Sequence, residues 1–162
     1  MTEETINACI SHTDKEIKGF FREYRWLSNF HICNVVFEGV VYPSSENAYQ
    51  AAKCPPDQRR WFERCSPKDA KHLGRRAKID VAHWDKIKMP TMTVILMAKF
   101  TGNVGLMDKL LATGDRYLEE TNWWGDTFWG VCNGKGENIL GKQLMALRQT
   151  YRLFTVSPNA LL

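Results

Sequence analysis

Helix caps and prolines divide the middle of this 162-residue chain into short segments. Ser44-Ser45 stands before a helical pattern that stops at Pro55-Pro56, because a serine oxygen accepts the free amides of a first turn and proline disfavours a helical residue before it. Similar signals recur as far as Gly114. They predict helices over residues 46–54, 58–65, 68–75, 81–87, 92–100 and 106–111, and apolar spacing predicts a closing amphipathic helix over 139–151.

Strand patterns are short and few. Ile17–Phe21 and Tyr117–Thr121 each predict one strand, and Cys33–Tyr42 predicts a hairpin that turns at Glu38-Gly39. A chain of this length can bury a stable core as one domain. We therefore expect an α+β fold, a helix-rich single domain with a small antiparallel sheet over residues 16–155, preceded by a flexible N-terminal lead-in at 1–15 and followed by a tail at 156–162.

Composition and charge exclude several classes of protein. The longest apolar run, Val94–Ala98, is too short to span a membrane and no secretory pattern opens the chain, so we expect a cytoplasmic monomer without membrane association. The five cysteines form no Cys-x-x-Cys pair and the four histidines lack metal-ligand spacing, so we expect no metal and no other cofactor. The net charge of +4 favours an anionic partner but is too small for a dedicated nucleic-acid binder.

The helix predicted after Ser45 carries the first candidate site. Glu46, Tyr49, Gln50 and Lys53 follow the i, i+3, i+4, i+7 spacing and share one face. Glu46 and Lys53 are two turns apart, about 10 Å along the axis, so they can converge on a small group bound between them. The alternative is a surface helix with a solvated charged stripe.

Three glycine-rich or aromatic segments carry weaker candidates. Asp126 lies among aromatic side chains in 123–130, where an acid partly removed from water suits proton transfer; alternatively, it accepts backbone hydrogen bonds in a core loop. The turn at 133–142 opens a helix and can bind an anion. In 21–30, Arg22 suits a phosphate, but the segment can also be a loop anchored by its aromatic rings.

Taken together, the motifs resemble the NADAR family, also called YbiA-like. The resemblance covers residues 18–152, nearly the whole chain, with every motif in order. It implies a compact α+β fold and cleavage of N-glycosidic bonds at C1′ of a phosphorylated ribose. Some members act on phosphoribosylamino-pyrimidine intermediates of riboflavin biosynthesis, and others remove ADP-ribose from guanine in nucleic acid. The motifs are Leu27–Phe30, Tyr42–Lys53, Ala70–Arg75, Trp84, Lys99-Phe100, Leu110–Gly114, Trp124–Gly130, Gly134–Asn138 and Leu140–Met145.

The resemblance also implies roles for individual residues. Lys53 would attack the ribose carbon and form a Schiff base, and Glu46 would transfer protons. Asp126 would be a second acid or would anchor a sugar hydroxyl. The partner would be a phosphoribosyl or ADP-ribosyl small molecule, or ADP-ribosylated guanine in nucleic acid; the alternative is a module that binds such a group without turnover. Residues that would line the pocket are Arg22, Ser28, Asn29, Tyr49, Trp84, Trp129 and Asn138.

Overall fold

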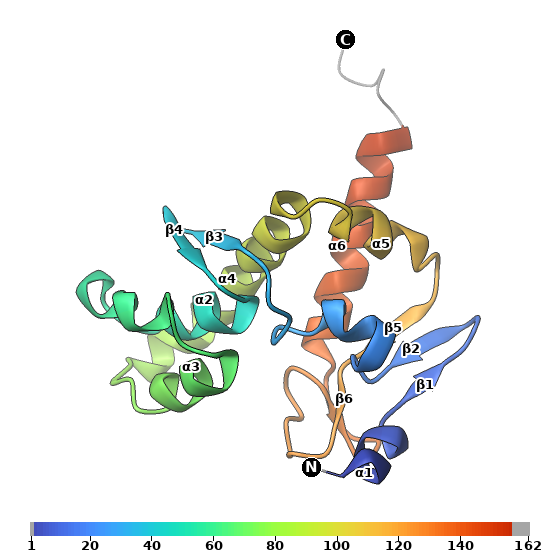
Figure 1. Cartoon of the computed structure of the whole chain (residues 1–162), viewed down its shortest axis with the longest axis horizontal. Helices are drawn as coiled ribbons and strands as arrows, with labels where there is room; N and C mark the ends of the chain where they lie inside the picture. The colour runs from blue at the N-terminus through green and yellow to red at the C-terminus, as the bar shows by residue number, and fades with distance from the viewer. Residues whose placement is uncertain (1, 157–162) are drawn as a thin grey trace. The chain divides into compact units, whose positions relative to one another are not determined.

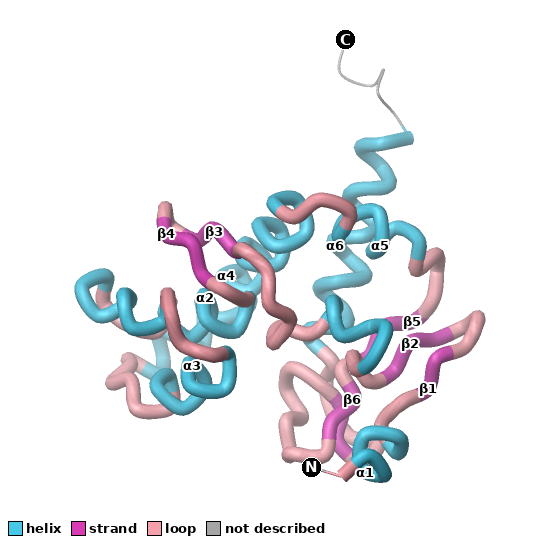
Figure 2. The backbone as a smooth tube through the Cα atoms, in the orientation of Figure 1, coloured by secondary structure: helices cyan, strands magenta, loops and turns pink. Residues whose placement is uncertain are grey.

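The computed structural model describes residues 2–156, which fold into two compact units. The central unit comprises Asn29–Leu106, and the terminal unit combines Met1–Ser28 with Met107–Leu162. Helices make up most of the regular structure, and the strands are short (Figures 1 and 2). The predicted helix-rich α+β class is confirmed.

The central unit contains one hairpin and a series of helices (Figure 1). The strands β3 (Val35–Phe37) and β4 (Val40–Tyr42) pair antiparallel around the predicted turn at Glu38-Gly39, with Val35 opposite Tyr42 and Phe37 opposite Val40. This hairpin packs on α4, and α2 packs on both α3 and α4. The helices are α2 (Ser45–Ala51), the 3-10 helix η2 (Pro56–Phe62), α3 (Pro67–Gly74) and α4 (Val81–Gly102).

Three side-chain caps start these helices where the sequence predicts them. Ser44 Oγ accepts a hydrogen bond from the amide of Asn47 at 3.1 Å. Ser66 Oγ likewise accepts a hydrogen bond from the backbone amide of the third residue of α3 at 3.1 Å. Asp80 caps α4 through the amide of His83 at 3.0 Å. Each cap satisfies a donor that the first turn leaves free, which fixes where α2, α3 and α4 begin.

The helix α4 does not break at Pro90. Two helices are predicted there, but the structure has one helix from Val81 to Gly102, with the proline inside it. An internal proline costs a helix about 3 kcal/mol through the lost hydrogen bond and the ring's clash. Burial of the apolar side chains on the face that packs against β3 and α2 offsets this cost. These side chains are Met92, Ile95, Leu96 and Phe100.

The terminal unit is built around a small mixed sheet and a long helix. The strand β2 pairs antiparallel with β1, as expected for the small antiparallel sheet. The pairs β2–β5 and β6–β7 are parallel, so the expectation is wrong for these two pairs. The residues that join β2 and β5 leave room for a parallel crossover. The elements are α1 (Glu3–Ala8), β1 (Ser11–His12), β2 (Glu16–Lys18), the 3-10 helix η1 (Arg22–Leu27), α5 (Leu106–Ala112), β5 (Tyr117–Glu119), β6 (Thr121–Asn122), β7 (Val131–Cys132) and α6 (Ile139–Val156).

Within the expected lead-in at 1–15, the described residues contain the helix α1 and the strand β1. Thr2 caps α1 by accepting the amide of Thr5 at 3.3 Å, and Ser11-His12 pairs with β2. The helix α1 buries none of its residues, so no apolar periodicity marks it in the sequence. At the other end, α6 extends to Val156, and the predicted tail from residue 157 onward lies outside the described residues.

Candidate active site

The predicted face of α2 is buried. Glu46 is 7% exposed, and Tyr49 and Gln50 are each 5% exposed. The alternative of a solvated charged stripe is therefore wrong for these positions. Burying a carboxyl group is costly unless hydrogen bonds or a charge compensate, so its immediate partners matter.

Glu46 is held from the side chain and from the backbone. Gln50 Nε2 donates to Glu46 Oε1 at 2.9 Å, one turn along the same helix. The backbone amide of Glu46 donates to the carbonyl oxygen of Asn29 at 2.9 Å, which ties the start of α2 to the segment before the hairpin. The Glu46 carboxyl group thus accepts a hydrogen bond from a side chain on the same face of α2.

Lys53 lies just beyond the end of α2, in a turn. The helix ends at Ala51 rather than at the predicted Cys54, and the amide of Lys53 bonds to the carbonyl of Gln50 at 3.2 Å, in the tighter 3-10 pattern. Lys53 Nζ is 5.2 Å from the centroid of the Tyr49 ring and 5.7 Å from that of Trp84. The two rings are themselves 5.2 Å apart. The amine therefore lies against aromatic faces, which attract a cation and exclude water.

The surroundings of Lys53 favour its neutral form. Burial lowers the pKa of the Lys53 ammonium below its ordinary value; the Glu46 carboxylate opposes this and raises the pKa, and the cations Lys71 and Arg75 lower it. Desolvation is the largest of these effects. A lowered pKa increases the fraction of free amine near neutral pH, which is the form that can act as a nucleophile.

Asn29, also in the central unit, has a buried side-chain oxygen without a hydrogen-bond partner. Its Oδ1 is buried without a hydrogen-bond partner, while its Nδ2 meets only the sulfur of Met92 at 3.6 Å. An unmatched buried acceptor costs about 1–3 kcal/mol, so such an atom suits a hydroxyl of a bound molecule. Asn29, Glu46, Tyr49, Lys53 and Trp84 are the predicted site residues that the central unit contains.

Three residues of the central unit were missed as site residues from the sequence. Lys71 and Arg75 lie in the family motif Ala70–Arg75 but are not among the predicted site residues, and both act electrostatically on Lys53. Gly74 lies between them on α3, and a Cβ built at this position would come within 1.9 Å of Gln50 Oε1. The spacing 71, 74, 75 follows i, i+3, i+4, which is the signal that could have identified a face packed against α2.

Asp126, in the terminal unit, has the contacts of a structural residue. Its Oδ1 accepts from the amides of Phe128 and Trp129 at 3.2 and 2.9 Å. Asn122 closes the same loop by bonding both the amide and the carbonyl of Asp126. These bonds favour the second interpretation drawn from the sequence, an acid that accepts backbone hydrogen bonds; its role as a second catalytic acid stays a prediction.

Asn138 is likewise engaged within the terminal unit. Both hydrogens of its amide are used, one by the hydroxyl of Tyr117 at 3.0 Å and one by the carbonyl of Leu118 at 2.9 Å. Its Oδ1 accepts from the amide of Glu120 at 3.1 Å. These bonds join the start of α6 to β5 and its neighbour, so the structure gives Asn138 a structural role, and its predicted contact with substrate is untested.

The other predicted pocket residues of the terminal unit differ in burial. Arg22 is exposed, and its guanidinium donates to Glu3 at 3.2 Å and to Asn7, both on α1. Ser28 is buried, whereas Trp129 is half-buried. The side chain that the sequence offered as a phosphate ligand is therefore engaged by α1.

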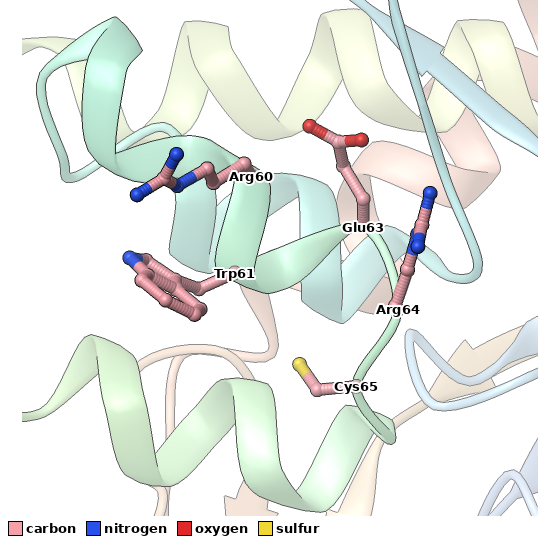
Figure 3. A pocket seen from close by; sticks show the side chains of 5 residues that line it. All are labelled: Arg60, Trp61, Glu63, Arg64 and Cys65. Carbon is pink, nitrogen blue, oxygen red and sulfur yellow. The ribbon is translucent and has the colours of Figure 1, made fainter.

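The structure has a hollow of about 510 Å³ beside η2 (Figure 3). Arg60 stacks on the ring of Trp61 with its guanidinium carbon 4.9 Å from the ring centroid, and Arg64 lies on the other side of the hollow (Figure 3). Glu63 and Cys65 complete the lining. None of the predicted catalytic or substrate-binding residues lines this hollow.

Metal binding and thiol chemistry find no support in the central site. Among residues 2–156, no group of three or more His, Cys, Asp or Glu side chains could hold a metal ion. Burial raises the pKa of the Cys54 thiol, next to Lys53 in the chain, so it is a poor nucleophile.

Within residues 2–156 no helix is long and apolar enough to cross a membrane.

The chain is similar in sequence to proteins of one known family. Residues 14–152 match the NADAR domain family. The chain is 36% identical over 131 residues to the N-glycosidase YbiA of Escherichia coli (strain K12), covering 78% of this chain and 81% of YbiA. It is 30% identical over 139 residues to an N-glycosidase of Nostoc punctiforme, covering 82% and 88%. A riboflavin biosynthesis protein of Vibrio vulnificus (strain YJ016) is 35% identical over 130 residues, 76% of this chain but 35% of that longer protein.

The fold agrees as well. The NMR structure of the E. coli protein YbiA superposes with a TM-score of 0.78 at 31% identity, covering 96% of each chain. The α+β fold, with the buried Glu46 on α2 and the Lys53 amine just beyond the end of that helix, is that of a known class of protein. The chain belongs to the NADAR family, which confirms the resemblance drawn from its motifs.

Proposed function

We propose that this protein hydrolyses the N-glycosidic bond at C1′ of a phosphorylated ribose, with Lys53 as the nucleophile and Glu46 as the proton-transfer group. Family membership and several relatives named N-glycosidase make the chain a hydrolase that acts on N-glycosyl bonds. One observation carries the assignment of residues: burial lowers the pKa of Lys53 beside the buried carboxyl group of Glu46.

The first step exchanges one nitrogen for another at C1′. The neutral amine of Lys53 forms a bond to C1′ while the bond between C1′ and the base nitrogen breaks. The Glu46 carboxylate takes a proton from the newly bonded Lys53 nitrogen and delivers it to the departing base. Proton transfer by a positioned group of this kind contributes about 10²–10⁴-fold in rate.

The second step returns the enzyme with one water consumed. The ribose ring opens to a Schiff base between Lys53 and C1′ as Glu46 carries the remaining proton of the Lys53 nitrogen to O4′. The Glu46 carboxylate then accepts a proton from the water that adds to C1′ and returns it to the Lys53 nitrogen. The bond from C1′ to Lys53 then breaks, and the sugar leaves with a hydroxyl at C1′. The base carries away one proton of the water and the sugar carries away the hydroxyl, so the products are the free base and the free sugar.

The surrounding side chains position the substrate and limit water. The rings of Tyr49 and Trp84 flank the amine and provide flat apolar surface for a base. The unpartnered Oδ1 of Asn29 suits a ribose hydroxyl. The tie from the Glu46 amide to the Asn29 carbonyl keeps this acceptor next to the start of α2.

Two substrate classes share this chemistry. One is the phosphoribosylamino-pyrimidine intermediates of riboflavin biosynthesis, which the name of the Vibrio relative supports. The other is ADP-ribose attached to guanine. A module that only binds the sugar phosphate is not favoured, because binding alone needs no buried acid beside an amine of lowered pKa.

The test measures base release from both substrate classes by the wild-type protein, two variants of Lys53 and one control variant. Lys53→Ala and Lys53→Arg should each lower turnover by at least about 10³-fold, because arginine stays protonated and cannot attack carbon. Lys86→Arg, at an exposed position of α4, is the matched control and should keep wild-type turnover. Borohydride added during turnover should reduce the Schiff base and leave a sugar adduct on the peptide that contains Lys53.

The outcomes separate the alternatives. Near wild-type turnover by Lys53→Arg would overturn the covalent mechanism. Base release by wild type with no trapped adduct would point to direct attack by water. Tight binding of ADP-ribose with no release from either substrate class would favour the binding module.

A further inference from the structure

We propose that Arg75 and Lys71 of α3 form the subsite that binds the phosphate group of the substrate. This inference rests on the proposed function, since it concerns the same substrate. It is argued from the packing of α3 against α2, from the contact of Lys71 with Phe30 in the loop before the hairpin, and from the distribution of charge around Lys53.

Close packing places this face of α3 against the catalytic face of α2. A Cβ at Gly74 would come within 1.9 Å of Gln50 Oε1 and 2.7 Å of Gln50 Cδ, so only a glycine fits here without displacement of the glutamine. Gln50 in turn donates to Glu46. Lys71 and Arg75 are three residues before and one residue after Gly74, which puts both on the same side of α3. They therefore border the face that carries Glu46.

Lys71 is placed by a second contact. Its Nζ lies 5.5 Å from the centroid of the Phe30 ring. Phe30 follows Asn29, whose carbonyl accepts the amide of Glu46 and whose Oδ1 is the unpartnered acceptor. A phosphate bound by Lys71 would thus sit near the atom that suits a ribose hydroxyl, as expected when one molecule carries both groups.

The charged groups around Lys53 favour the binding of a negatively charged phosphate. Lys71 and Arg75 are near enough for both to disfavour the charged form of Lys53, and the Glu46 carboxylate opposes them, as does the Cys54 thiol to a smaller extent. Two cations against one carboxylate, beside the amine, leave positive charge that a phosphate can neutralise.

Arg75 is suited to the role by its geometry and exposure. Its side chain is exposed at the end of α3, and within residues 2–156 it makes no hydrogen bond or ion pair. A guanidinium fork can bind two phosphate oxygens at once, and Lys71 adds a point charge. Arg22, by contrast, is engaged by Glu3 and Asn7, and Arg60 stacks on Trp61 beside the separate hollow.

The test compares each substrate with its counterpart that lacks the phosphate. We expect the double variant Lys71→Met with Arg75→Met to lower kcat/KM at least about tenfold more on a 5′-phosphoribosyl substrate than on the matching ribosyl substrate, because loss of the two cations near Lys53 affects both substrates but only the phosphorylated one loses a phosphate contact. Arg75→Lys should recover part of the loss. The matched control is Arg76→Met with Lys78→Met, which removes the same charge at exposed positions next to the subsite and should leave both values within about twofold.

Ligand binding provides a readout that needs no turnover. Calorimetry with ribose 5-phosphate and with ADP-ribose should show weaker binding by the Lys71/Arg75 double variant, while the control variant binds as wild type does. If the double variant binds ribose 5-phosphate more weakly, the subsite binds a terminal phosphate. If only the binding of ADP-ribose is weakened, the subsite binds the diphosphate. Thermal unfolding of both double variants checks that the fold is kept, and Arg75→Lys provides the comparison if the double variant is unstable.

The two proposals fail in different ways. If wild type releases base and the double variant keeps the full preference for the phosphorylated substrate, the subsite is wrong and the proposed function stands. If wild type releases no base but ribose 5-phosphate binding is lost in the double variant, the function is wrong and the subsite stands. Unchanged binding of both ligands by the folded double variant overturns the subsite.

Discussion

Two segments, the helix α2 and the loop at 123–130, each place an acid among aromatic side chains, but the acids have different partners. In α2, a side chain of the same helix face, Gln50, donates to the carboxyl group of Glu46. In the loop, the carboxylate of Asp126 accepts two amides of its own backbone. Hydrogen bonds from backbone amides to a carboxylate stabilise the conformation of a loop. A side-chain donor, by contrast, can reorient when the carboxyl group gains or loses a proton.

The difference extends to the neighbouring charges. Lys53 feels the carboxylate of Glu46, and burial lowers its pKa. The loop carries Trp123 stacked on Phe21 at 5.5 Å, an apolar contact that packs the terminal unit. An acid among aromatic rings is therefore a weak sign of catalysis by itself, and an acid coupled to a buried amine is a stronger one.

The largest effect should come from Glu46→Gln. The amide cannot take or give the proton in either step, so kcat should fall by about 10²–10⁴-fold. Base-release kinetics measure the loss, and thermal unfolding should show a folded protein because glutamine has nearly the same shape. A kcat within threefold of wild type would remove Glu46 from the mechanism.

A smaller loss should follow Gly74→Ala, which acts on Glu46 through its neighbour. The new methyl group displaces Gln50, so the hydrogen bond to Glu46 is lost and kcat/KM should fall about tenfold. The better helix propensity of alanine, worth about 1 kcal/mol, offsets part of the strain, so stability should change less than activity. Gly102→Ala is the control, since a Cβ there meets no atom within 4 Å. Equal activity of the two variants would contradict the account.

The smallest effect on chemistry should come from Asp126→Asn. A neutral amide holds the backbone donors of Phe128 and Trp129 less strongly, so the free energy of unfolding should fall by about 1–2 kcal/mol while kcat stays within threefold. Chemical denaturation and base release measured on the same variant separate the two quantities. A large loss of kcat at unchanged stability would make Asp126 the second acid after all.

Local signals in the sequence predicted α2 and its neighbours well. The cap at Ser44, the hairpin turn at Glu38-Gly39 and the i, i+3, i+4, i+7 face from Glu46 to Lys53 depend on residues close together in the chain. The structure agrees with them except that α2 ends before Lys53. These features could be predicted from the sequence because contacts between residues close together in the chain determine them.

Other features depend on contacts that no local pattern contains. The helix α4 continues through Pro90 because it packs on β3 and α2, and α1 carries no buried residue that could mark it. Lys71 and Arg75 look like solvated charges until the close approach at Gly74 shows which face of α3 meets α2. Asp126 could not be assigned, because its sequence surroundings fit both a catalytic acid and a loop residue.

The most direct test of the central claim is the titration of the Lys53 amine, followed by NMR of its labelled side chain. The pKa should lie below the ordinary lysine value of about 10.4, and Glu46→Gln should lower it further, because the carboxylate favours the charged form. Turnover should rise with pH through the same pKa, as the neutral amine forms. An ordinary pKa for Lys53, unmoved by Glu46→Gln, would contradict the account.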